Sequence, residues 1–123
     1  MWNTKFVIRH SLIRHFRFLS IFASMKQIFL KDKRDAAVLR FHPWVFSGAV
    51  ARKSGAIEDG EWVEVRSHKS DLLGMGHYQD GSICVRLLSF QPTEIDQSFW
   101  TKKIANAYQY RKAIELTDRE LIN

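Results

Sequence analysis

Short apolar runs separated by turn-forming residues constrain the fold of this chain more than any other feature of its sequence. Five such runs follow one another at regular spacing, each with the length and composition typical of a β-strand. They are Gln27–Lys31, Trp44–Val50, Glu61–Ser67, Leu72–Tyr78 and Ile83–Phe90. Gly, Asp, Ser and Pro recur between them, as is usual in tight turns. The pattern predicts a mainly β domain with short helices, built as a small β-barrel or open sandwich.

Two further segments are predicted to be helical. Asp35 can cap a helix of about two turns, which must end before Pro43 because the residue preceding a proline avoids the helical conformation. Asp96 can cap a longer helix that runs from Gln97 to about Leu116. Its apolar residues recur close to the helical period, and they are Trp100, Ile104, Ala107, Tyr108 and Ile114. We expect this stripe to dock onto protein that follows in a longer chain.

Glycines inside the apolar runs predict local departures from regular strands. Gly48 is expected to form a bend or bulge that would not tolerate a β-branched residue. Gly74 and Gly76 fall on the same face of one predicted strand. Another part of the protein is therefore expected to pack closely against that face.

The charge balance favours an anionic partner, although less strongly than the net charge suggests. The 123 residues suffice for one domain, and 46% hydrophobic and 26% charged residues are ordinary for a globular protein. The chain has nineteen basic and thirteen acidic residues, so its net charge is +6, which favours nucleic acid as a partner. Residues 1–24, however, hold four basic residues and no acidic one, so the rest of the chain is only mildly basic.

The first 24 residues form a basic leader whose role has two interpretations. The longest uncharged run of this leader, Phe18–Met25, has eight residues and is too short to cross a bilayer. The leader could be a mitochondrial or membrane-surface segment, or upstream sequence translated from a start codon set too early. We prefer the second interpretation, because Met25 directly precedes the first predicted strand. Residues 1–24 are thus expected to be disordered or a mis-assigned start, and no membrane partner is expected.

The sequence shows no catalytic constellation. Gly74-Met75-Gly76 lacks the third glycine and the following helix of a dinucleotide-binding loop, and the five histidines lack metal-ligand spacing. The single cysteine, Cys84, lies within a predicted strand and is expected to be a small buried apolar residue. A chain with one cysteine fits a reducing, cytoplasmic setting. We expect no catalytic residue, no metal and no cofactor in this chain.

The segment Leu39–Val50 is the strongest candidate for a binding site. It joins the short helix to a strand and combines a guanidinium and aromatic rings with small residues. Arg40 and backbone N–H groups could contact phosphate while His42 or Trp44 stacks on a base. Other interpretations stay open: Arg40 could equally be a solvated helix end, and Trp44 is expected more as a core residue than as a stacking platform.

Within this segment, residues His42–Val50 read His-Pro-Trp-Val-Phe-Ser-Gly-Ala-Val. The run resembles a motif of the class I, S-adenosylmethionine-dependent, cytosine-C5 methyltransferases of large-subunit ribosomal RNA. Members of that family open with a PUA domain, an RNA-binding module. The resemblance implies a PUA-like barrel over residues 25–92 and a linker helix over residues 93–123, leading to a methyltransferase domain that is missing here. S-adenosylmethionine would bind in the missing part, and the present chain would contribute RNA binding, with ribosomal RNA as its partner.

The resemblance also implies which residues contact RNA. In PUA domains the loop after the first helix and the last strand form the RNA surface, which here points to Arg40, His42, Trp44, Ser47, Gly48 and Arg86. Two functions remain open at this point. The chain is either the RNA-binding module of a truncated ribosomal RNA methyltransferase, or a structural spacer that packs on the catalytic part and touches RNA little. An independent enzyme is not expected.

Overall fold

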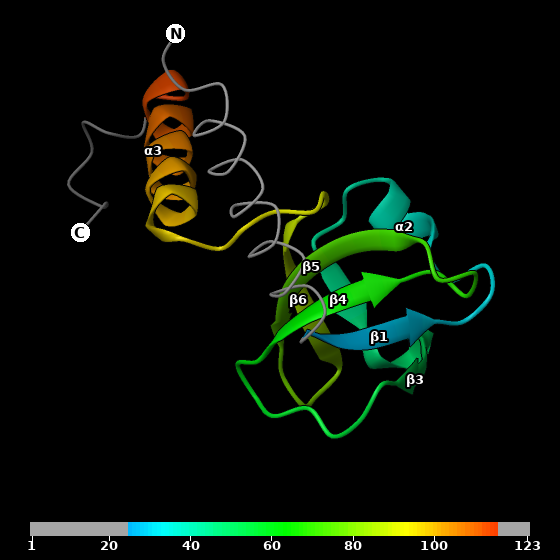
Figure 1. Ribbon diagram of the computed structural model, residues 1–123. Coiled ribbons are helices and arrows are strands. Elements are labelled where there is room, and N and C mark those ends of the chain that lie inside the picture. Colours follow the sequence, from blue (N-terminus) through cyan, green and yellow to red (C-terminus); the bar gives the residue numbers. More distant parts are fainter. Residues whose placement is uncertain (1–24, 116–123) are drawn as a thin grey trace, which may run out of the picture. The chain divides into compact units, whose positions relative to one another are not determined.

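The computed structural model describes residues 25–115, which belong to two compact units (Figure 1). One unit ends at Thr93, and the other begins at Glu94 and contains a single long helix. Residues 1–24 and 116–123 lie outside the described part, and so do the expectations for the basic leader. Among the described residues, no helix is long and apolar enough to cross a membrane.

The first unit is built around one curled sheet of six strands, which confirms the predicted mainly β class (Figure 1). The strands are β1 (Lys26–Leu30), β2 (Trp44–Phe46), β3 (Val50–Lys53), β4 (Trp62–Arg66), β5 (Leu72–Tyr78) and β6 (Ile83–Ser89). Their order across the sheet is β2-β6-β5-β4-β1-β3. All neighbours are antiparallel except β1 and β4, which run parallel.

The single strand expected over Trp44–Val50 is wrong, because the segment divides into three elements. Strand β2 gives way to a 3-10 turn at Ser47–Ala49, and β3 begins only at Val50. Strands β2 and β3 lie at opposite edges of the sheet, so the turn carries the chain from one edge to the other. Alternation of apolar residues could not reveal this division, since both halves of the segment are extended.

The core lies on the concave face of the curled sheet. Its central residues are apolar side chains that alternate along the strands: Ile28, Leu30, Val63, Val65, Val85 and Leu87. Val45 of β2 and Val38 of the short helix join the same cluster. Each fully buried side chain of this size contributes about 1.5–3 kcal/mol, so the cluster supplies most of the driving force for folding this unit.

The two strand glycines allow β5 to coil closely against β6, as their shared face predicts. A Cβ atom at Gly76 would lie 2.0 Å from the carbonyl oxygen of Arg86, and one at Gly74 would lie 2.9 Å from that of Ser89. Gly48 behaves differently from its prediction. It lies in the 3-10 turn without a positive φ, and a Cβ atom there would meet nothing within 4 Å. The bend exists, but it does not depend on a missing side chain.

Helix α2 (Ala36–Leu39) is shorter than expected and ends in a Schellman motif. Asp35 precedes it but makes no side-chain capping hydrogen bond, so the predicted cap is wrong. At the other end, the N–H of Phe41 donates to Val38 and the N–H of His42 donates to Ala37, at 2.9 and 3.0 Å. Phe41 takes φ +62°, a conformation that usually requires glycine. This turn directs the chain sharply out of the helix and into β2.

The second unit consists of helix α3 (Gln97–Ala113) and its flanking residues. Its predicted cap is confirmed, because the carboxylate of Asp96 accepts a hydrogen bond from the N–H of Phe99 at 2.8 Å. Several members of the apolar stripe, including Ile104, Tyr108 and Ile114, are exposed. What the stripe docks onto stays a prediction.

Candidate nucleic-acid interface

An aromatic ring and a guanidinium are placed side by side on strands β2 and β6. Trp44 pairs with Arg86 in the antiparallel register of these strands. Directly opposed residues of an antiparallel pair project from the same face of the sheet, so both side chains share one surface. Both are exposed, and Arg86 Nη1 donates a hydrogen bond to the side-chain oxygen of Gln79. This pairing brings together residues 42 positions apart in the sequence.

Two further aromatic rings extend the surface around Trp44. The His42 ring lies 5.9 Å from the Trp44 ring and 6.5 Å from the Phe46 ring, measured between centroids. The N–H of Trp44 donates to His42 Nδ1 at 3.2 Å, which fixes the imidazole against the start of β2. We refer to His42, Trp44, Phe46 and Arg86 as the aromatic–guanidinium surface. Its groups are those that stack on bases and contact phosphates in proteins that bind single-stranded nucleic acid.

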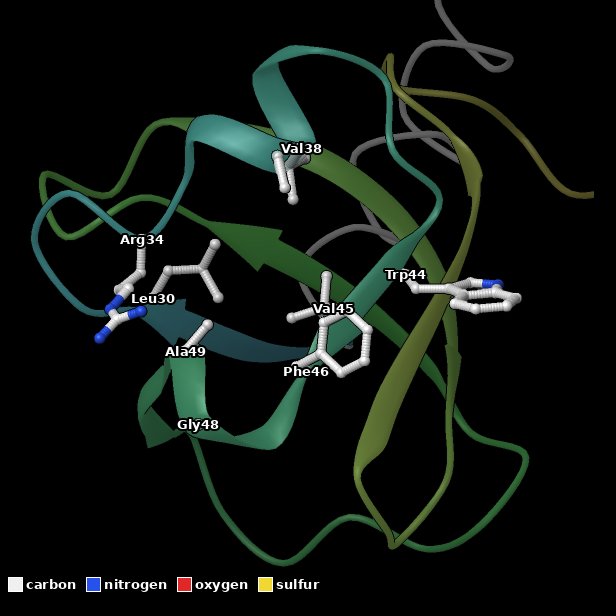
Figure 2. A pocket seen from close by; sticks show the side chains of 9 residues that line it. Leu30, Arg34, Val38, Trp44, Val45, Phe46, Gly48 and Ala49 are labelled. Atoms are coloured by element: carbon white, nitrogen blue, oxygen red, sulfur yellow. The ribbon is translucent and has the colours of Figure 1, made fainter.

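The expectation that Trp44 is a core residue is wrong. Its side chain is 46% exposed and that of Phe46 is 49% exposed, whereas Val45 between them is 2% exposed. The strand therefore turns its valine inward toward Val38, whereas the Trp44 ring points away from both valines (Figure 2). Val45 belongs to the same core cluster as Val38 and Val85.

The remaining predicted contact residues lie on both sides of β2. Arg40 caps the C-terminal end of α2 and is exposed; its guanidinium makes no hydrogen bond or ion pair with the described residues. Ser47 and Gly48 lie in the exposed 3-10 turn that follows β2. The N–H of Ser47 donates to the carbonyl of Ser82, which anchors this turn to the β5–β6 hairpin. All six predicted residues are exposed, and β2 with its flanking turns carries five of them.

A pocket that no sequence pattern indicated opens beside the aromatic–guanidinium surface (Figure 2). Its volume is about 420 Å³, and it lies between α2, β2 and the 3-10 turn. Val38, Val45 and Leu30 supply apolar walls, and Arg34 and Phe46 line it as well. Phe46 could have been found from its spacing of two residues from Trp44. Arg34 could not, because it sits in a turn among other charged residues.

Cys84 is buried and fills the role expected of a small apolar residue. Its thiol donates to the carbonyl of Val45 at 3.4 Å, and burial raises the pKa of the thiol. Nearby, the hydrogen bond to the Tyr78 hydroxyl raises the pKa of the exposed Lys53. Within residues 25–115 no group of three or more His, Cys, Asp or Glu residues could hold a metal ion. None of these features assembles a nucleophile with an adjacent base.

The sequence of this chain is similar to a known domain family and to longer known proteins. A family model described as a PUA-like domain matches residues 28–90. The chain is 39% identical over 87 residues to ribosomal RNA large subunit methyltransferase I of Escherichia coli O1:K1, covering 69% of this chain and 22% of that protein. The protein of the same name from Salmonella typhi is 37% identical over 94 residues, covering 75% and 23%. The chain therefore spans less than a quarter of the length of these relatives.

A solved structure shares the fold at low sequence identity. It is a Streptococcus mutans protein described as a SAM-dependent methyltransferase, with a TM-score of 0.57 and 14% identity. The match covers 72% of this chain and 23% of that one. At this level of identity the likeness concerns the fold alone, and it again involves a small part of a longer protein.

Proposed function

Because the chain belongs to the PUA-like domain family, we propose that it is the RNA-binding module of a large-subunit ribosomal RNA methyltransferase. The matched region, residues 28–90, contains the whole aromatic–guanidinium surface. The identity of 39% to a ribosomal RNA methyltransferase supports ribosomal RNA as the partner. The methyl transfer itself would belong to sequence that the longer relatives have and that this chain does not match.

The exposed pairing of Trp44 with Arg86 is the observation that carries the proposal. An indole that is half exposed on an edge strand contributes less to a core than a buried one, and it offers a flat ring to solvent. Stacking of a base on such a ring is worth about 1–3 kcal/mol in proteins that bind single strands. A guanidinium beside it can hold a phosphate of the same strand through charge-assisted hydrogen bonds. Arg40 and Ser47 extend the contact along the backbone of the RNA.

The alternative function is a structural spacer with little RNA contact. The small net positive charge of residues 25–123 favours this alternative. Residues 25–123 hold fifteen basic and thirteen acidic residues, so no strong general attraction for RNA acts on this part. A spacer, however, gives no reason for rings and guanidinium groups to be gathered and exposed on one surface. The two functions differ in whether RNA affinity responds to salt.

We do not assign S-adenosylmethionine to this chain. A nucleotide-type cofactor of this kind binds at the switch point of a doubly wound parallel sheet. Within residues 25–115 the sheet is antiparallel apart from the β1–β4 pair, and these residues therefore do not fit the cofactor. We also propose a cytoplasmic location, which the free thiol of Cys84 supports.

The test is a titration of the full chain with a labelled fragment of large-subunit ribosomal RNA, at several salt concentrations between about 50 and 200 mM. If the module neutralises phosphates, the logarithm of its RNA affinity should fall steeply and linearly as the logarithm of the salt concentration rises. Arg86→Met should weaken RNA binding about tenfold or more. It should also reduce the slope of log affinity against log salt concentration by about one in magnitude, the effect expected for one lost phosphate contact. Lys69→Met, in an exposed turn away from the surface, is the matched control and should change affinity less than about twofold. Salt-independent or absent binding would establish the spacer instead.

A further inference from the structure

Helix α3 carries more net positive charge than the whole described part of the first unit. Its seventeen residues, Gln97–Ala113, include four basic residues and no acidic one. Residues 25–93 hold ten basic and eight acidic residues, so their net charge is only +2. The positive charge of the described residues is therefore unevenly distributed, and α3 attracts anionic partners more strongly than the sheet does.

One side of α3 is lined by side chains that can donate hydrogen bonds. Lys102, Asn106 and Gln109 follow one another at intervals of four and three residues, and Lys112 comes three residues later, so the four lie on neighbouring positions of the helix surface. We refer to these four residues as the donor face of α3. All four are exposed, and within residues 94–115 none of their side chains forms a hydrogen bond or ion pair. The donor face extends about 15 Å along the helix axis, at about 1.5 Å per residue.

Helix stability does not account for the residues of the donor face. On a solvated helix a Lys is usually stabilised by an Asp or Glu three or four residues away. The four such positions around Lys102 are held by Ser98, Phe99, Ala105 and Asn106. Asn is also a weak helix former in a helix interior. Lys112, in the last turn, interacts favourably with the helix dipole, but Lys102 lies in the N-terminal half and gains nothing from it.

The apolar residues of α3 lie on the opposite side of the helix. Ile104 is two residues from both Lys102 and Asn106, which places it about 200° around the axis. Ile104 and Tyr108 are 69% and 56% exposed, and we expect this stripe to pack on protein. The donor face is left for a different partner. RNA phosphates fit it, because they are anionic, accept hydrogen bonds and recur along the strand at a spacing that a row of donors can follow.

We infer that the donor face of α3 binds phosphates of the RNA backbone and forms a second RNA-contacting element of the module. The inference rests on the proposed function and extends it from the sheet to the helix. Phosphate contacts position an RNA without reading its sequence, so this face would supply affinity rather than specificity. Because both elements belong to one chain, contact at one raises the effective concentration of RNA at the other.

The first test is a titration of the full chain with the labelled fragment of large-subunit ribosomal RNA, at salt concentrations between about 50 and 200 mM. The double variant Lys102→Gln/Lys112→Gln should weaken RNA binding about tenfold, from about threefold for each exposed contact. It should also reduce the slope of log affinity against log salt concentration by about two in magnitude.

Two control variants lose the same amount of charge elsewhere. Lys103→Gln/Arg111→Gln removes two charges from α3 outside the donor face, and Lys33→Gln/Lys69→Gln removes two from exposed turns of the first unit. Each control should weaken RNA binding less than about threefold. Far-UV circular dichroism checks that α3 stays helical, because Arg111 also donates to the carbonyl of Ala107 within the helix.

The second test observes the donor face directly and examines another anionic partner. RNA added to the natural chain should shift the side-chain amide resonances of Asn106 and Gln109, and the shifts should be smaller in Lys102→Gln/Lys112→Gln. Vesicles of phosphatidylcholine with about one-fifth phosphatidylserine test a membrane surface. Vesicle binding that the double variant loses, while its RNA binding is unchanged, would overturn the inference in favour of anionic lipid.

The outcomes separate this inference from the function on which it rests. Equally small losses of RNA affinity in all three double variants, with Arg86→Met still strongly impaired, would leave the RNA-binding module standing and remove α3 from the RNA contact. Absence of any salt-sensitive RNA binding by the natural chain would remove both. Selective loss of affinity in Lys102→Gln/Lys112→Gln, together with the amide shifts, establishes the donor face as an RNA-binding element.

Discussion

Trp44 and Arg86 lie opposite each other on antiparallel neighbours, one on the edge strand β2 and the other on β6. Both side chains therefore leave the sheet on the same face. The guanidinium is held by Gln79 rather than by an acidic residue, so its charge is not neutralised within the pair. A ring that can stack and a cation that can hold phosphate are thus fixed by the rigid register of a sheet, which is more precise than placement on two separate loops.

Substitution of Trp44 and of its neighbour Val45 should have opposite effects. Trp44→Ala removes a half-exposed ring, so it should weaken RNA binding by about 1–3 kcal/mol, which is about 5- to 150-fold, with little change in melting temperature. Val45→Ala removes a side chain that is 2% exposed and should cost about 1.5–3 kcal/mol of folding stability. One thermal melt and one RNA titration of each variant check this. A large loss of folding stability in Trp44→Ala would show instead that the Trp44 side chain packs in the core.

Gly76 and Gly48 form a second matched pair. Gly76→Ala would place a methyl group 2.0 Å from the carbonyl oxygen of Arg86, so β5 and β6 must separate and the domain should be destabilised by about 3 kcal/mol or more. Gly48→Ala meets nothing within 4 Å and needs no positive φ, so it should be neutral or slightly stabilising. Denaturant midpoints of the two variants give the comparison. Equal midpoints would mean that the sheet relaxes around residue 76.

Alkaline pH should destabilise the domain partly through Cys84. Burial raises the pKa of this thiol in the folded state, so its contribution to stability is complete below the ordinary thiol value of 9.0 and is lost as pH rises through the higher folded value. The free energy of unfolding should therefore fall more steeply above about pH 9 in the natural chain than in Cys84→Ala. Denaturant titrations at pH 7 to 10 measure the difference. Identical slopes would show that the thiolate forms in the fold without penalty.

The chain is expected not to bind S-adenosylmethionine. The sheet of the described residues is antiparallel apart from the β1–β4 pair, so it does not form the doubly wound parallel sheet with a switch point at which nucleotide-type cofactors bind. Isothermal calorimetry with S-adenosylmethionine at millimolar concentration should therefore give no binding heat. The RNA fragment serves as the positive control in the same cell. A saturable heat with the cofactor would contradict this expectation.

The strands were largely predictable because each is a short apolar run bounded by turn-forming residues. Ile83–Ser89 and Leu72–Tyr78 appear at their expected places, and the close packing at the strand glycines follows from their shared face. Division of the 44–50 segment was not predictable, since it depends on pairing with strands far along the chain. The motif around His42 drew attention to residues that the structure leaves exposed, and their contact with RNA stays a prediction. The outward direction of Trp44 was not predictable, because it depends on which face of β2 is buried in the core.

Glu64 shows the limit of alternation as a guide to exposure. It falls on the outward face of β4 with Trp62 and Arg66, and such a face is usually solvated. The carboxylate is nevertheless buried, at 1% exposure, and it is paired with Arg66 at 2.7 Å and with the Gln27 amide at 3.1 Å. A buried charge requires such partners. Arg66 lies on the same strand as Glu64, whereas Gln27 comes from β1 and reaches Glu64 only because of the sheet order, which no local pattern contains.

The position of β1 between β3 and β4 has a consequence for the order in which the domain can assemble during synthesis. The strand is made first, but its parallel partner lies 37 residues later, as the Gln27–Glu64 contact measures. Strand β3 is made before β4 and pairs with the other edge of β1, so these two strands can pair first but join the rest of the sheet only after β4 has left the ribosome. Pairings that span many residues close slowly and leave apolar strand edges exposed meanwhile. The nascent chain therefore carries one open edge of the apolar strand β1 until β4 has been synthesised.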